Sequence, residues 1–212
     1  VMLLIDVSGS RDFGTSGQLK RECATEIAAT LAFSAIQNND KIGVIFFSDY
    51  IEKYIAPKKG RKHILYLIRE MLTFTPNSKR TDVGVSLEYL NKVMKRRCTA
   101  FVISDFYTRK DFSQELRIAN KKHDVVAIQI YDPRAKEMPD VGLMKVVDAE
   151  TGHEMYIDTH DARLRKVHNK YWEEREIRLH EMLSQSHVDS VAIATDDDYV
   201  KMLMTLFSKR NR

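Results

Sequence analysis

The chain is poor in the residues that form covalent cross-links and irregular scaffolds. Its 212 residues include two cysteines, four prolines and eight glycines. Cys23 and Cys98 lie in neither a CxxC motif nor a Cys/His cluster, which argues against a disulfide framework and a structural zinc site. We expect both to be buried free thiols in a reducing compartment. A chain of this length can bury a sizeable core without such cross-links.

Long apolar runs are also missing. No segment approaches the ~20 apolar residues needed to span a bilayer, and the chain shows no signal peptide. It begins directly within a strand-like run, Val1 to Ile5. We therefore expect a fragment that lacks its N-terminal region. The expected location is cytoplasmic, with membrane association through the missing region as the alternative.

Charge of one sign is not concentrated along the chain. The net charge is +4 and the pI is near 8.9. The basic runs 58–62, 95–97 and 209–212 contain no interleaved aromatic residues that could stack on bases. We interpret them as solvated helix ends and turns. Nucleic-acid binding through these runs is a minor alternative.

Apolar segments of strand length alternate with amphipathic segments. The expected strands are rich in Val, Ile and Phe, as in sheets covered by helices on both faces; they are 1–6, 41–48, 98–104, 124–131 and 190–194. The expected helices are 17–37, 61–73, 82–96, 111–122, 160–184 and 196–208. This alternation predicts an α/β fold with a doubly wound, mainly parallel sheet flanked by helices.

Two segments depart from the regular alternation. Residues 50–56 predict an antiparallel edge strand that pairs with 41–48. Residues 143–157 predict an inserted β-hairpin with its turn at 148–152. The chain has no internal repeat and no Pro/Gly-rich linker, so a single domain over 1–212 is expected.

Polar side chains follow the ends of the predicted strands, where ligands bind in open α/β sheets. Asp6, Ser8 and Ser10 follow the first strand at alternate positions, and Gly9 permits a sharp turn between them. Thr81 precedes a predicted helix, and Asp105 follows another strand. We expect these five oxygen-bearing side chains to meet at one edge of the sheet.

Carboxylate and hydroxyl oxygens are hard ligands that suit Mg²⁺, Mn²⁺ or Ca²⁺ better than zinc. Two carboxylates would balance the divalent charge, and five side chains would leave a position for an incoming carboxylate. The set therefore predicts a divalent-cation site, with Mg²⁺ first, that binds a protein partner presenting Asp or Glu. Asp82 is expected to support a helix dipole instead, and Asp12 and Asp49 to be solvated loop carboxylates.

The pattern Asp6-x-Ser8-x-Ser10, with a distant Thr81 and a later Asp105, resembles the metal-ion-dependent adhesion site of von Willebrand factor A (vWA) domains. The resemblance covers essentially the whole chain, because the order and spacing of the strands match too. It implies a Rossmann-like vWA fold. It also implies that the hydroxyls and the carboxylates bind the metal directly or through water.

A narrower resemblance is to the bacterial family called domain of unknown function 58. It rests on Phe46-Phe47-Ser48-Asp49, Arg80-Thr81-Asp82-Val83-Gly84, Ser104-Asp105-Phe106 and Ala194-Thr195-Asp196-Asp197-Asp198-Tyr199. Proteins similar to these are typically encoded beside MoxR-type AAA+ ATPases and many carry membrane segments upstream. The resemblance implies an adaptor or chaperone-like partner of such an ATPase.

An enzyme on a similar sheet, a metal-dependent hydrolase or phosphatase, is the alternative. Such an enzyme needs a base or a positioned nucleophile near the ion. The strand-end loops contain no His, no Cys and no Gly-rich phosphate loop. Ser8 also stands where aspartyl phosphatases usually place a second acid. We therefore expect no catalytic residues and a non-enzymatic binding module.

Two adjoining rings, Tyr171 and Trp172, stand in the predicted helix 160–184. We expect one ring to pack on the core and the other to lie at its margin. An exposed pair would instead indicate a surface for a partner.

Overall fold

The computed structural model describes residues 1–9, 19–108, 110–147 and 153–210. Its elements, in chain order, are β1 (Met2–Asp6), α1 (Lys20–Gln37), β2 (Ile42–Phe47), β3 (Ile51–Lys58), α2 (Arg61–Thr73), α3 (Val83–Val93), β4 (Thr99–Ser104), α4 (Ser113–Lys122), β5 (Asp124–Tyr131), α5 (Pro133–Lys136), β6 (Leu143–Val147), β7 (Glu154–Asp158), α6 (Ala162–Gln185), β8 (Asp189–Ala194) and α7 (Tyr199–Arg210).

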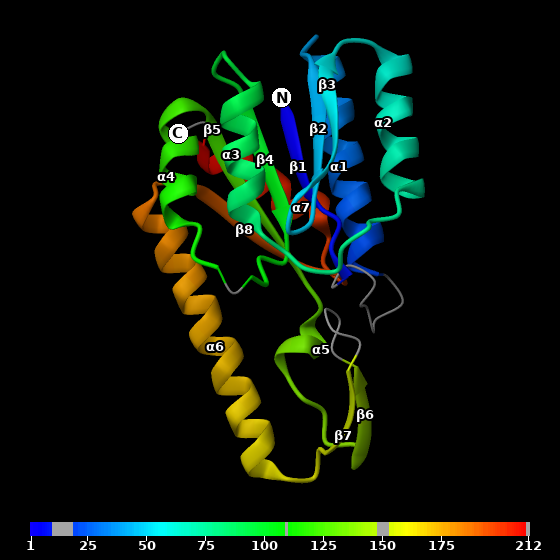
Figure 1. The fold of residues 1–212 in the computed structure, drawn as a ribbon, viewed down its shortest axis with the longest axis vertical. Helices are drawn as coiled ribbons and strands as arrows, with labels where there is room; N and C mark the ends of the chain where they lie inside the picture. Colours follow the sequence, from blue (N-terminus) through cyan, green and yellow to red (C-terminus); the bar gives the residue numbers. More distant parts are fainter. Residues whose placement is uncertain (10–18, 109, 148–152, 211–212) are drawn as a thin grey trace.

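The central sheet has the strand order β3-β2-β1-β4-β5-β8 (Figure 1). All neighbouring pairs in it are parallel except β2 and β3, which are antiparallel. The predicted doubly wound α/β fold and its antiparallel edge strand are therefore confirmed. Because β1 lies inside the sheet and next to β4, the residues that follow these two strands are neighbours at one edge.

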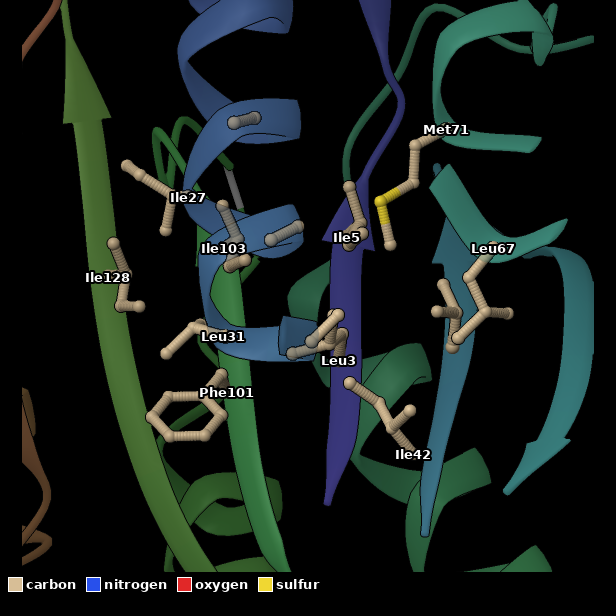
Figure 2. Close-up of a cluster of buried hydrophobic side chains, with 14 of the residues drawn as sticks. Leu3, Ile5, Ile27, Leu31, Ile42, Leu67, Met71, Phe101, Ile103 and Ile128 are labelled. Atoms are coloured by element: carbon tan, nitrogen blue, oxygen red, sulfur yellow. The ribbon is translucent and has the colours of Figure 1, made fainter. Parts of the chain in front are cut away.

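Both faces of the sheet are covered by helices. One apolar cluster joins the sheet to α1, α2 and α7, and the other joins it to α3, α4 and α6. Alternate residues of β1 divide between the two, since Leu3 and Ile5 belong to the first cluster and Met2 and Leu4 to the second. Figure 2 shows Leu3 and Ile5 among side chains from α1, α2 and the neighbouring strands. Burial on both faces explains why β1 is a continuous apolar run.

An inserted unit follows β5. Strands β6 and β7 pair antiparallel as a separate two-stranded sheet, which confirms the predicted hairpin; its predicted turn, 148–152, lies outside the described residues. The short helix α5 was not predicted. Figure 1 shows α5, the β6–β7 hairpin and the first half of α6 extending beyond the carboxyl ends of the parallel strands. The insertion therefore lies on the side of the sheet where the candidate site is expected.

Side-chain caps determine where several helices begin. Asp82 Oδ1 accepts the N–H of Val85, so Asp82 caps α3 from the position where the sequence predicted the first residue of the helix. Asp111 accepts the N–H of Ser113 at 2.9 Å, which places Asp111 in the turn before α4, where the sequence predicted the first residue of the helix.

Two expectations concern cysteines and membrane spans. Both cysteines are free, but Cys98 is only partly buried, whereas Cys23 is buried as expected. In the part of the chain that the structure describes, no helix has the length and apolar character of a bilayer-spanning segment.

Candidate metal centre at the carboxyl edge of the sheet

Asp6 is a buried carboxylate at the end of β1, with a 7% exposed side chain. Its Oδ1 accepts the backbone N–H of Ser8 at 2.9 Å. Its Oδ2 accepts the hydroxyl of Ser104, at the end of the neighbouring strand β4, at 2.6 Å. The pairing of Ile5 with Ile103 fixes this register. Asp6 is thus held by its own loop and by the adjacent strand.

The protonation of Asp6 reflects this environment. Burial raises the pKa of Asp6 to about 6, and the nearby charge of Asp105 raises it as well. The hydrogen bonds from Ser104 and Ser8 act in the opposite direction. The two carboxylates are therefore close enough to repel each other. A cation beside them would offset both the free-energy cost of the buried negative charge and the repulsion between the two carboxylates.

Asp105 follows β4 and makes contacts within its own loop and with helices α1 and α6. Its Oδ1 accepts the N–H of Tyr107 at 2.9 Å, and its Oδ2 accepts Lys20 Nζ, from the first residue of α1, at 2.7 Å. Its carbonyl oxygen accepts Arg175 Nη2, from α6, at 2.8 Å. One small cavity is lined by Asp6, Lys20, Ser104 and Asp105, among others. The structure therefore brings the two predicted carboxylates together.

The turn after Asp105 has an unusual backbone. Phe106 adopts a φ of 54°, a left-handed conformation that costs a non-glycine residue roughly 1 kcal/mol or more. Its N–H donates to Ser104 Oγ at 2.9 Å, and its buried ring stacks on Phe112 with the centroids 6.1 Å apart. These contacts hold the turn that directly follows Asp105.

Three backbone-mediated contacts bring the loops together at this edge. Gly9 N donates to the carbonyl of Lys79 at 3.1 Å, and the hydroxyl of Thr108 donates to the carbonyl of Thr81 at 3.1 Å. Asp82 N donates to the carbonyl of Ser48 at 2.9 Å. The loops after β1 and β4 and the loop before α3 therefore form one cluster.

The three predicted hydroxyl ligands differ in how closely the structure locates them relative to the two carboxylates. Ser8 and Thr81 are buried, with 2% and 9% exposed side chains, and both lie in the clustered loops. Neither lines the small cavity between Asp6 and Asp105. Ser10 lies outside the described residues, as does Asp12. Within the described ranges no three His, Cys, Asp or Glu side chains form a metal-binding group, which leaves hydroxyls as the remaining candidate ligands.

Asp82 does not line this cavity. Its Oδ2 accepts Lys110 Nζ at 2.5 Å, while its Oδ1 caps α3. Asp49 Oδ1 accepts Ser48 Oγ at the long distance of 3.5 Å. Asp82 therefore lies at the N-terminus of α3, where the sequence predicted that its charge supports the helix dipole.

Sequence reasoning missed Lys20, Ser104 and Arg175. Ser104 had one available signal, its position directly before Asp105 at the end of a strand. Lys20 and Arg175 had none, because only tertiary packing brings α1 and α6 to the loop after β4. The Arg175 guanidinium also lies 4.8 Å from the Tyr107 ring and 4.7 Å from the Trp172 ring.

Neither ring of the α6 pair packs on the core as expected, because Trp172 is half-buried and belongs to neither apolar cluster. Trp172 stacks on Tyr107 with the ring centroids 6.2 Å apart, whereas Tyr171 is 46% exposed. Trp172 packs against the loop that follows Asp105. The aromatic contact therefore fastens α6 to the candidate site.

Most of the chain is similar in sequence to one protein family and to proteins from mycobacteria. The family model described as "Protein of unknown function DUF58" matches residues 1–177. An uncharacterized protein of Mycobacterium tuberculosis is 33% identical over 152 residues, which are 71% of this chain and 48% of that protein. One from Mycobacterium avium is 28% identical over 160 residues, 74% of this chain and 94% of that protein. The chain thus spans about half the length of the Mycobacterium tuberculosis relative.

Solved structures show the same fold at low sequence identity. An aerotolerance-related membrane protein from Bacteroides fragilis has a TM-score of 0.68 at 13% identity, covering 99% of this chain and 97% of that one. BatB from Bacteroides thetaiotaomicron has a TM-score of 0.67 at 14% identity, with 98% and 96% covered. The SpRpn10 VWA domain has a TM-score of 0.54 at 12% identity, with 98% and 93% covered. The chain belongs to the DUF58 family, and its fold is that of a vWA-type domain.

Proposed function

We propose that this vWA-type domain is a non-enzymatic binding module that uses a divalent cation to bind a carboxylate of a protein partner. The cation, Mg²⁺ first with Mn²⁺ or Ca²⁺ as alternatives, would be held by Asp6, Ser8, Ser10, Thr81 and Asp105. The observation that carries this proposal is the convergence of Asp6 and Asp105 on one cavity, 99 residues apart in sequence, where each carboxylate is largely buried.

The chemistry of the donors suits a hard cation. Two carboxylates supply charge, and hydroxyls complete an oxygen shell of the kind that Mg²⁺ and Ca²⁺ accept. A shell of five side chains leaves room for one exchangeable ligand. A partner's Asp or Glu would fill that position and bring a further negative charge to the ion.

The surrounding residues favour binding over catalysis. Metal-assisted hydrolysis needs a base or nucleophile placed beside the ion. Loops 6–9, 79–82 and 105–108 contain no His, Cys or Glu. The hydroxyl of Thr108 donates to a backbone carbonyl, so it serves the loop structure.

The resemblance to proteins encoded beside MoxR-type AAA+ ATPases suggests such an ATPase as the first candidate partner. An acidic side chain at its docking surface would complete the coordination of the ion. Binding between the two purified proteins, measured in Mg²⁺ and in EDTA, tests this choice; equal affinity in both conditions would contradict it.

Isothermal titration with Mg²⁺ and Mn²⁺ tests the cation site itself. Asp6→Ala and Asp6→Asn should abolish the binding heat of the wild-type protein. Glu88→Ala is the matched control, because it removes an exposed carboxylate from α3. Equal heats in all four proteins would contradict the metal site. Turnover of a phosphate or carboxylic ester that requires Mg²⁺ and is lost in Asp6→Asn would contradict the non-enzymatic assignment.

A further inference from the structure

A groove of about 670 Å³ lies along α6, beside the turn that follows Asp105. One wall is the segment that follows Asp105, including Phe106, Tyr107 and Thr108, and it continues to the start of α4. The other wall is the second half of α6, including Arg175 and Leu179. Asp105 lines the separate small cavity with Asp6, and its carbonyl oxygen accepts Arg175 from the groove wall. A partner bound at the metal centre could therefore extend past Asp105 to the groove.

The floor of the groove is apolar. Phe106, Phe112 and Leu179 are buried there, with exposed fractions of 5%, 3% and 9%, and Met182 is half-buried. Because the three buried side chains expose little surface, apolar side chains of a bound segment would contact mainly Met182 and the exposed ring of Tyr171. The groove therefore fits an extended or helical peptide better than a small polar molecule.

The rim of the groove carries more positive than negative side chains. Four cationic residues line it, against two anionic ones; they are Lys110, Arg117, Arg175 and Arg178, and Asp111 and Glu181. Asp111 already accepts both the N–H and the hydroxyl of Ser113. Lys110 pairs with Asp82, which leaves three arginines against Glu181. The rim therefore attracts acidic ligands.

Arg117 and Arg178 are the cations best placed to meet a ligand. Both are exposed. Arg117 donates through Nε to the carbonyl of Ser113, an arrangement that leaves the terminal nitrogens of the guanidinium for another acceptor. Arg178 lies 4.0 Å from Glu174, which is the outer limit of an ion pair and contributes little at an exposed position.

We propose that this groove binds an acidic segment of the protein partner whose carboxylate the cation binds, with Arg117 and Arg178 pairing with its Asp or Glu side chains. This inference rests on the proposed function, because one partner would fill both sites. Arginine suits the role because its planar guanidinium binds carboxylates in a bidentate geometry. The acidic segment would add affinity and orientation to the single contact at the metal.

A nucleic acid is a poorer fit to the same groove. Single-stranded binding surfaces offer open aromatic faces on which bases stack. Here the rings of Tyr107 and Trp172 stack on each other, and the Arg175 guanidinium lies over both. Apart from the exposed ring of Tyr171, the stacking surface is therefore already used within the protein.

Fluorescence anisotropy with fluorescein-labelled hexaglutamate tests the groove. The variant Arg117→Glu/Arg178→Glu should bind this peptide about tenfold more weakly than wild type, both in EDTA and in Mg²⁺. The matched control is Lys62→Glu/Arg69→Glu, which makes the same charge change on exposed residues of α2. Helix α2 packs on the opposite face of the sheet. The control and wild type should bind alike, and labelled hexaglutamine should bind none of the proteins.

Three results would overturn the groove proposal: equal affinity of the two double variants, no binding of hexaglutamate to wild type at low salt, or tighter binding of oligothymidylate. Mg²⁺ titration of the groove variant should give the wild-type heat, which shows that the fold and the cation site are intact. The experiments distinguish failure of the cation-site proposal from failure of the groove proposal. Loss of Mg²⁺ binding with an intact groove effect contradicts the cation site alone, and the reverse result contradicts the groove alone.

Discussion

Lys20 Nζ lies 2.7 Å from Asp105 Oδ2, so an ion pair joins the first turn of α1 to the loop after β4 across 85 positions. The two side chains are 11% and 10% exposed, so water screens the pair much less than it screens a surface pair. Asp105 is also a proposed ligand of the divalent cation. The ammonium group of Lys20 and the cation therefore compete for the same carboxylate.

Replacing Lys20 by Met should tighten Mg²⁺ binding by about three- to tenfold. The substitution keeps the apolar stem and removes a positive charge that opposes the incoming ion, and the expected change in affinity corresponds to roughly 1 kcal/mol. Titration calorimetry measures it, with Lys59→Met as the control at an exposed lysine. Weaker Mg²⁺ binding in Lys20→Met would instead mean that Lys20 orients Asp105 for the metal.

The metal-free protein should lose stability as the pH rises, because of Asp6. The pKa of Asp6 is about 6 in the folded protein, against an ordinary value of 3.8 that applies to the unfolded chain. The folded state therefore binds the proton of Asp6 more tightly. Protonation of Asp6 contributes its full stabilisation below pH 3.8. This contribution is lost as the pH rises through 6. The total change is about 3 kcal/mol.

Urea unfolding in EDTA between pH 4 and pH 7.5 measures this dependence. Asp6→Asn should gain stability relative to wild type as the pH rises, and the difference should level off above about pH 7. Glu88→Gln serves as the control for loss of an exposed carboxylate. Saturating Mg²⁺ should reverse the order, because the ion stabilises ionised Asp6. A pH-independent difference between wild type and Asp6→Asn would contradict the burial argument.

The central fold could be predicted because its strands are buried on both faces. In β1, Leu3 and Leu4 face opposite apolar clusters, so the strand reads as a continuous apolar run. The convergence of Asp6 and Asp105 could also be predicted, since parallel strands end at one edge and β1 pairs with β4. The five-residue ligand set itself stays a prediction, in part because Ser10 lies outside the described residues.

The contacts that orient these carboxylates could not be predicted. Lys20 and Arg175 reach Asp105 from helices 85 and 70 positions away. Their approach depends on the direction that α1 and α6 take over the sheet, which local periodicity does not encode. Helix α6 also follows the inserted β6–β7 hairpin in the chain. Sequence pattern therefore predicted the candidate ligands but not the positively charged groups around them.

Ser104→Ala should destabilise the protein by about 1–3 kcal/mol. Ser104 Oγ donates to Asp6 Oδ2 and accepts the N–H of Phe106, so the substitution leaves two groups at a buried position without this partner. The pKa of Asp6 should rise further, because the hydrogen bond from Ser104 lowers it. Mg²⁺ affinity should fall as well.

Urea unfolding and Mg²⁺ titration of Ser104→Ala and Ser104→Thr separate the hydroxyl from the side-chain volume. The threonine variant keeps the hydroxyl and should recover most of the metal affinity. If both variants bind Mg²⁺ like wild type, Ser104 has no part in positioning Asp6.

Arg175→Gln should loosen α6 from the candidate site. The wild-type guanidinium donates to the carbonyl of Asp105 and lies over the rings of Tyr107 and Trp172. Loss of the hydrogen bond and of both cation–π contacts should cost about 1–3 kcal/mol. Urea unfolding measures this loss directly.

Trp172 is the single tryptophan of the chain, so its fluorescence reports on the contact between α6 and the loop after Asp105. In Arg175→Gln the emission should shift to longer wavelength, and iodide should quench it more strongly, because the ring becomes more hydrated. Arg178→Gln, one turn further along α6, should leave both unchanged, since that side chain is exposed and contacts neither ring. Wild-type emission in Arg175→Gln would show that the Tyr107–Trp172 stack alone holds α6 in place.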